Sequence, residues 1–220
     1  MRSFLLLQLG DSAFPAGGFA HSAGLEASAQ LGEVPTAASI RAFFEQILWQ
    51  TGLGALPFLR ASHRDPSEIQ AHDALCHAFF TSHVANRGSR TQGRAFIATS
   101  ARVLDEEPVK DLDRRVRTRA LHGHHAPLFG AVLRAASASL EDAQRLYLHL
   151  ALRGVASAAV RLGLLGPHEA QRLQRELGPL CERVLADCGA RDLTLATQPA
   201  PLLDLFGSLH DRLYARLFLS

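Results

Sequence analysis

The sequence predicts an all-α fold, in which a single domain of about ten helices spans residues 1–220. Leucine and alanine dominate the composition while valine and isoleucine are scarce, and unbranched side chains lose little conformational freedom in a helix. Apolar residues recur at three-and-four spacing along most of the chain, which is typical of amphipathic helices. Proline and glycine separate these stretches, and no stretch shows a convincing strand pattern.

The first part of the chain predicts three helices. Residues 3–9 are apolar and are expected to form a short helix that enters a Gly- and Pro-containing loop. Residues 20–30 form the next predicted helix, which Leu31-Gly32 ends. Thr36 is the expected N-cap of an amphipathic helix. The apolar residues of that helix recur at helical spacing: Ile40, Phe43, Phe44, Ile47 and Leu48. Pro57 either kinks it or begins a second piece.

The middle of the chain predicts three more helices. Asp65-Pro66 reads as an N-cap followed by proline at the first helical position, and His83 is a candidate for the inner face of that helix. Residues 89–104 form the next helix, and residues 108–120 follow after a break at Glu106-Glu107. Residues 108–120 contain the cluster RRVRTR, which we interpret as a solvated helix face.

The last part of the chain begins with a turn at residues 121–127, which leads into a helix whose first residue is expected to be Pro127. Ser139 and Asp142 have the form of a capping box at the start of the longest helix. Pro167 starts the following helix, which is expected to bend at Gly178-Pro179. After an extended connector, a final amphipathic helix is predicted to run almost to Ser220. Its apolar positions are Leu202, Leu205, Phe206, Leu209, Leu213 and Leu217.

Charge and cysteine content exclude several classes of protein. The formal net charge of +2 argues against broad nucleic-acid binding. No apolar run approaches the length of a membrane span, and the run at residues 4–7 is too short for a signal peptide. Three cysteines without a CxxC pair suggest free thiols in a reducing compartment. We therefore expect a cytoplasmic protein that contacts neither nucleic acid nor membrane.

The motifs of nucleotide chemistry are missing from the sequence. It contains no GxxxxGK[ST] loop, so the chain is not expected to hydrolyse GTP or ATP by itself. Ser22, His21 and Asp11 could be drawn as a hydrolytic triad, but no GxSxG turn follows a predicted strand. We predict no catalytic residue.

A histidine cluster gives the alternative hypothesis. His122, His124 and His125 lie within four residues, and neutral imidazole nitrogens are good ligands for nickel or zinc. The chain could on this ground be a metal-binding sensor or a metal-dependent hydrolase. The competing interpretation is a polar turn before a helix, and it is favoured because no cysteine or acidic ligand lies near in the sequence.

Two segments carry apolar and aromatic residues where a loop or a tail is usually polar. The N-terminal segment 1–30 contains Phe14 and Phe19 on either side of a Gly-Gly bend, and the C-terminal segment 200–220 ends in RLYARLFLS. Helical spacing does not account for Phe218 and Leu219. We expect partner proteins to cover these segments, because aromatic side chains supply much of the binding energy at protein interfaces.

Motifs in these two segments make the chain resemble the urease accessory protein F (UreF) family. The N-terminal motif reads LLQL at 6–9, followed by DSAFP, GGF, HS and GLE between 11 and 26. The C-terminal motif reads APLLD at 200–204, followed by HD, LY and RLF between 210 and 218, with Ser220 last. Residues between them fit the same pattern: Gln92, Gly93, Gly130, Arg161, Leu162, Gly166 and Gln171. Phe19 stands where many relatives carry Tyr, and Pro167 where many carry Gln.

The resemblance implies an all-α assembly factor without enzymatic activity. Such a protein forms a homodimer, binds the UreD/UreH protein and recruits the GTPase UreG to that complex. Together they deliver nickel to apo-urease, so nickel would pass through the complex and no cofactor would be bound stably. The resemblance also implies that the C-terminal segment becomes ordered on UreD/UreH.

The resemblance also assigns residues to these contacts. Phe4 is expected at the homodimer contact, while Phe14, Phe19 and Glu26 are expected to hold or form the surface on which the GTPase docks. A set in the C-terminal segment is expected to bind UreD/UreH: Tyr214, Arg216, Leu217 and Phe218. Arg216 is also expected to face UreG, where it would affect GTP hydrolysis.

Overall fold

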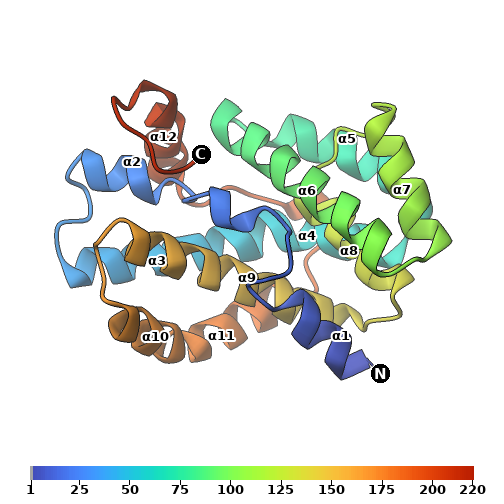
Figure 1. Cartoon of the computed structure of the whole chain (residues 1–220), viewed down its shortest axis with the longest axis horizontal. Coiled ribbons are helices and arrows are strands. Elements are labelled where there is room, and N and C mark those ends of the chain that lie inside the picture. The colour runs from blue at the N-terminus through green and yellow to red at the C-terminus, as the bar shows by residue number, and fades with distance from the viewer. Residues whose placement is uncertain (1) are drawn as a thin grey trace.

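The structure is a computed structural model that describes residues 2–220, and over that range it contains helices and no strand (Figure 1). The α-helices are α1 (Arg2–Leu9), α2 (Leu25–Gln30), α3 (Ala37–Gln50), α4 (Leu56–Arg64), α5 (Ile69–Phe79), α6 (His83–Val103), α7 (Glu107–Arg117), α8 (His125–Ala135), α9 (Leu140–Arg161), α10 (Pro167–Glu176), α11 (Gly178–Cys188) and α12 (Pro201–Ser208). The all-α, single-domain prediction is confirmed.

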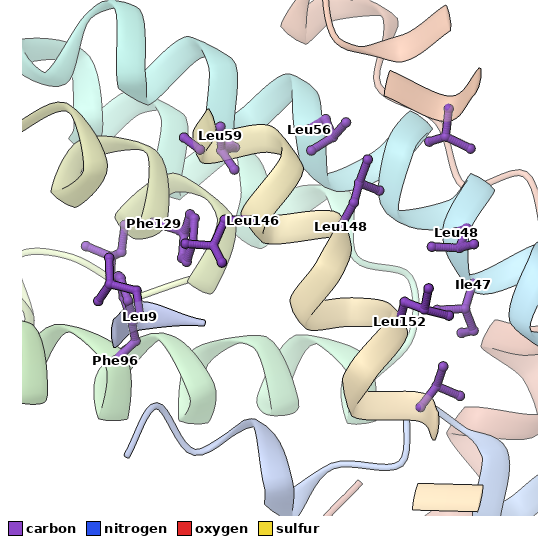
Figure 2. Packing of buried hydrophobic residues seen from close by; sticks show 14 of the residues in the cluster. Leu9, Ile47, Leu48, Leu56, Leu59, Phe96, Phe129, Leu146, Leu148 and Leu152 are labelled. Carbon is purple, nitrogen blue, oxygen red and sulfur yellow. The ribbon is translucent and has the colours of Figure 1, made fainter. Parts of the chain in front are cut away.

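Helices α8 and α9 form the centre of the molecule. Helix α8 packs against α4, α5, α6, α7 and α9, and α9 also packs against α3, α10 and α11. Figure 2 shows how α9 serves two parts of the core, with Leu146 beside Phe129 and Leu152 beside Ile47 and Leu48. Gly130 lets α8 approach α4 closely, because a Cβ atom there would collide with the Leu59 carbonyl group.

Helix α1 and the C-terminal residues lie far apart (Figure 1). Helix α1 lies beside α9 near one end of the molecule. Residues 11–24 then cross the face of the molecule to reach α2 at the other end. Helix α12 packs against α2 and α6, so the C-terminal residues meet the N-terminal chain at α2. No helix in the described part of the chain is long and apolar enough to cross a bilayer.

Several local predictions are confirmed. Thr36 accepts a hydrogen bond from the Ser39 backbone N–H, and Ser139 accepts one from Asp142, so both cap a helix as expected. The helix after Thr36 continues through a π-helical turn at Thr51–Ala55 into α4, with Pro57 in the first turn. Helices α10 and α11 meet at Gly178, which confirms the predicted bend.

Other predicted bounds are wrong. The final helix ends at Ser208, and after a 3₁₀ turn at Leu209–Arg212 the remaining residues are not helical. Their backbone N–H groups bond to distant parts of the chain, as described below. Residues 21–24 are not helical because Gly24, at φ 86°, is the N-cap of α2. His83 is the first residue of α6, so it does not lie on the helix after Asp65-Pro66, and α6 begins before the predicted residue 89. Helix α8 begins at His125 rather than at Pro127.

Candidate functional site

The loop at residues 11–24 lies against α6 and is fixed by two glycines. Gly17 and Gly24 have φ values of 75° and 86°, in the left-handed region that glycine adopts without strain. Thr99 on α6 donates a hydrogen bond to the Pro15 carbonyl oxygen at 2.9 Å. Phe14 is half-buried with its ring 6.4 Å from that of Phe96, whereas Phe19 is 68% exposed. The loop therefore has one anchored and one exposed aromatic side chain.

The tail, which we define as residues 209–220, pairs with this loop through backbone hydrogen bonds. Leu219 N–H donates to the Ala20 carbonyl oxygen at 2.8 Å, and Ser22 N–H donates to the Ser220 carbonyl oxygen at 2.7 Å. The Ser220 hydroxyl lies 2.6 Å from His21 Nδ1. Gly88 on α6 makes room for it, since a Cβ atom there would lie 2.7 Å from the Ser220 oxygen. The tail and the loop thus form one backbone-paired unit.

Glu26, at the start of α2, is the buried centre of this unit. Its side chain is 1% exposed and accepts hydrogen bonds from Leu217 N–H at 2.6 Å and Phe218 N–H at 3.2 Å. His210 Nε2, which is also fully buried, lies 3.0 Å from the same carboxylate. A buried carboxylate requires such donors, because the desolvation cost of the charge is otherwise several kcal/mol. Glu26 therefore holds the tail at two places, at His210 and at the backbone of residues 217–218.

Arg161, at the end of α9, joins the loop to the tail from the other side. Its guanidinium carbon lies 3.9 Å from the ring centre of Phe19 and 4.2 Å from that of Phe218. Its Nη1 also donates to the Phe19 carbonyl oxygen at 2.6 Å. Cations over aromatic faces are attracted by the ring quadrupole. The three side chains form a clamp across the two segments.

Charged residues tie the start of the tail to α6. Arg87 donates two hydrogen bonds to the Asp211 carboxylate at 2.9 and 2.6 Å. This pair lowers the pKa of Asp211 to about 2. His83 lies 3.2 Å from the same carboxylate, and Arg216 Nη1 lies 3.4 Å from it. Arg216 is thus on the surface but directed toward its own chain.

The tail leaves a set of apolar side chains in solvent even though its backbone is fixed. Tyr214 is fully exposed, and Leu217 and Leu219 are each 61% exposed. Neighbouring α12 adds Leu202 at 61% and Leu205 at 54%. Exposed large apolar side chains on a fixed backbone are a feature of interaction sites.

Most predicted partner-binding residues come together here, with one correction. Phe218 is only 5% exposed, so it does not present its side chain to a partner as expected. Glu26 was expected to hold or to form a docking surface, and its buried side chain holds the tail in place. Phe4 lies apart on α1, where it is 78% exposed. Sequence reasoning gave no role to Arg161, His210 or Asp211. All three residues belong to the motifs that the chain shares with the family, and that was the available signal.

The structure forms neither the hydrolytic triad nor the three-histidine metal site considered from the sequence. Asp11 is exposed and its carboxylate accepts a hydrogen bond from Ala13 N–H, while His21 and Ser22 both bond to Ser220, so the hydrolytic triad is wrong. Among residues 2–220, no three His, Cys, Asp or Glu side chains are arranged to hold a metal ion.

His125 is separated from the other two clustered histidines, which corrects the metal-ligand set expected from the sequence. His125 lies in the core among Phe96, Phe129 and Tyr147, while His124 stacks on Phe80. His122 is exposed on the turn. His125 is the first residue of α8 and its ring lies in the core, whereas the rings of His122 and His124, on the turn before the helix, have centres 6.3 Å apart. Burial lowers the pKa of His124 and of His125 to about 3, so both are neutral at pH 7.

Comparisons with known proteins agree with these motifs. The sequence model of a family described as UreF matches residues 34–178. The urease accessory protein F of Oryza sativa subsp. japonica is 36% identical over 215 residues, which cover 96% of this chain and 82% of the relative. The protein of the same name from Arabidopsis thaliana is 36% identical over 217 residues, 97% of this chain and 90% of the relative. The urease accessory protein UreF of Mycobacterium tuberculosis (strain ATCC 25618 / H37Rv) is 30% identical over 216 residues, 98% of each chain.

Proposed function

This chain belongs to the UreF family of urease accessory proteins, and we propose that it is a non-enzymatic scaffold that joins UreD/UreH and the GTPase UreG. The complex would insert nickel into apo-urease in a GTP-dependent step, with nickel as its cargo. The chain would act on the GTPase rather than replace it, because its sequence lacks a GxxxxGK[ST] loop. We place this step in the cytoplasm, where the free thiols of Cys76, Cys181 and Cys188 would stay reduced.

The observation that carries the proposal is the tail with its fixed backbone and exposed side chains. Glu26 and the loop fix the backbone of residues 217–220, so a partner that binds Tyr214 and Leu217 has little chain entropy to remove. The exposed Phe19 of the loop lies next to the tail, because Arg161 contacts both its ring and that of Phe218. We therefore assign UreD/UreH to the tail and UreG to the adjoining loop and Arg216.

Co-purification of a tagged chain with UreD/UreH and UreG tests this assignment. The double variant Tyr214→Ser, Leu217→Asp changes exposed side chains and leaves Glu26 and Phe218 in place. It should lose UreD/UreH, whereas the control Leu195→Asp, at a site 54% exposed elsewhere, should retain it. Deleting residues 211–220 should also abolish co-purification. Retention of UreD/UreH by the double variant would overturn the assignment.

A second contact, between two copies of the chain, is proposed at α1. Phe4 and Leu7 are 78% and 68% exposed, and Leu7 lines a surface hollow of about 320 Å³. Its lining comes from α1 and α9: Leu6, Leu7, Gly10, Asp142, Arg145, Leu146 and His149. A protruding apolar side chain next to an apolar hollow is self-complementary, as a twofold homodimer requires.

Light scattering tests the dimer. Phe4→Asp should convert a dimer to a monomer, and Leu75→Asp on α5, a site 48% exposed, should not. A dimer that persists in Phe4→Asp would place the contact elsewhere.

A further inference from the structure

Three imidazole rings gather where the end of α5 meets the turn before α8. His77 from α5 stacks on His122 with ring centres 4.0 Å apart and planes 3° from parallel. On its other side, His77 Nδ1 lies 3.2 Å from His124 Nε2. His122 is exposed, His77 is half-buried and His124 is buried, so the rings lead from solvent to the interior. His77 was not part of the cluster expected from sequence, because it lies 47 residues from His124.

The hydrogen bonds around His124 assign its proton. Ser89 Oγ accepts a hydrogen bond from His125 N–H at 3.3 Å and lies 3.1 Å from His124 Nδ1. We assign to neutral His124 the tautomer with its proton on Nε2, in which the Ser89 hydroxyl donates to Nδ1. His124 Nε2–H then donates to His77 Nδ1. One proton thus lies between two imidazole nitrogens 3.2 Å apart, and Asn86 Nδ2 lies 3.3 Å from the same His77 Nδ1.

We propose that a borderline transition-metal dication, of the Zn²⁺, Ni²⁺ or Cu²⁺ class, takes the place of this shared proton between His77 and His124. Metal–nitrogen bonds of about 2.0–2.1 Å at a tetrahedral angle hold two ligand nitrogens roughly 3.3 Å apart, close to the distance between these two atoms. The displaced proton moves to His124 Nδ1, which donates it to Ser89 Oγ, and the Ser89 hydroxyl turns away. The number of bound protons is unchanged.

His122 supplies the third ligand after a side-chain rotation. In the present arrangement its ring lies face to face with His77, so its nitrogens do not point at the shared position, in agreement with the absence of a three-ligand group among residues 2–220. Because His122 is exposed, it can change rotamer at little cost, and water completes the coordination. The nearby Arg90 and Arg94 guanidinium groups oppose a cation and the Asp73 carboxylate favours it, so the affinity should be moderate.

The site is independent of the proposed function, because it lies on α5 and the α8 turn and uses no residue of the loop or tail. It can therefore be tested on the purified chain alone. Isothermal titration with Zn²⁺, and separately with Ni²⁺, should show one equivalent bound. His77→Gln and His124→Gln should each weaken binding by at least tenfold, and Ser89→Ala by about tenfold through the lost support of the ligand. His168→Asn, an exposed histidine on α10, is the matched control and should bind as the parent does.

A spectroscopic readout separates ligation from a general effect on the fold. Nitrogen-15 NMR of the imidazoles should show His124 changing from the Nε2–H to the Nδ1–H tautomer when Zn²⁺ is added. If His124→Gln does not fold, the less buried His77→Gln and His122→Asn variants still decide the matter. The absence of stoichiometric binding, or equal binding in His77→Gln and the control, would overturn the proposal while leaving the UreF assignment untouched.

Discussion

Two buried carboxylates in this molecule accept hydrogen bonds from backbone N–H groups of a distant segment, with different consequences for the fold. Asp73 on α5 accepts hydrogen bonds from the backbone N–H groups of His122, Gly123 and His124, at 2.5, 3.2 and 2.8 Å. Glu26 on α2 accepts them from Leu217 and Phe218. Each carboxylate is 1% exposed. Each therefore fixes a non-helical segment that is distant in sequence.

The difference lies in what each held segment is attached to. The turn at 122–124 joins α7 to α8, and α8 packs against five other helices at the centre of the core. The tail held by Glu26 lies on the surface after α12, and its outward side chains lie in solvent. The same interaction thus supports the global fold in one case and the conformation of a surface segment in the other. Predictions at Asp73 and at Glu26 test this distinction, and a third, at His125, tests the core beside the turn.

The largest effect is expected at Asp73. Asp73→Ala leaves three backbone N–H groups of the turn without their acceptor and should lower the free energy of unfolding by about 4 kcal/mol. Denaturation in urea measures it. The control is Asp65→Ala, which removes an exposed capping interaction with Ser67 N–H and should cost about 1 kcal/mol. Equal losses in the two variants would contradict a special role for Asp73.

The second effect concerns pH and the core next to the turn. Burial lowers the pKa of His125 to about 3, whereas in the unfolded chain it is about 6.5. Between these values the unfolded state binds a proton that the native state does not, so stability is complete above about pH 6.5 and falls as the pH is lowered toward 3. Between pH 7 and pH 5 this histidine alone should account for a loss of roughly 2 kcal/mol.

The variant His125→Phe isolates that contribution. Phenylalanine suits a site lined by Phe96 and Phe129, and the His125 Nε2 atom has no hydrogen-bond partner among the described residues. The variant should lose about 2 kcal/mol less than the parent when the pH falls from 7 to 5. Urea titrations at both values measure this. An unchanged pH dependence would show that His125 does not titrate in the unfolding transition.

The smallest global effect is expected at Glu26. Glu26→Gln keeps the size of the side chain but removes the charge that faces His210 and the tail N–H groups. Amide hydrogens of Leu217, Phe218 and Leu219 should exchange at least about tenfold faster, because the tail can open without the core. Amides of α8 should change less than about twofold. If the amides of α8 accelerate as much as those of the tail, the contrast with Asp73 fails.

Elements with local signals were predicted well from the sequence. The caps at Thr36 and Ser139 and the bend at Gly178 follow from residues within a few positions of each helix end. The final helix was predicted too long because Leu213 and Leu217 continue the helical spacing of α12. Periodicity carries no information about a competing acceptor, and here Glu26, 191 residues from Leu217, takes the N–H group instead.

The candidate site shows the same division. Its exposed members Phe19, Tyr214 and Leu217 were expected to bind partners because the two segments that carry them resemble the family motifs. Phe218 belongs to the same sequence pattern, yet its ring is buried beside Arg161. Composition cannot separate these cases, since which face of a non-helical segment is covered depends on the element packed against it.

The sequence by itself determined that the chain is helical, where several helices begin, and to which family it belongs. The helices follow from apolar spacing and capping residues, which act over a few positions of the chain. The family follows from motifs that can be compared directly between sequences. The tertiary structure alone decided that Glu26 holds the tail, that Arg161 joins the loop to it, and that His77 rather than His125 accompanies His122 and His124. Each of these contacts joins residues from separate elements, and their distances are set by the packing of whole helices.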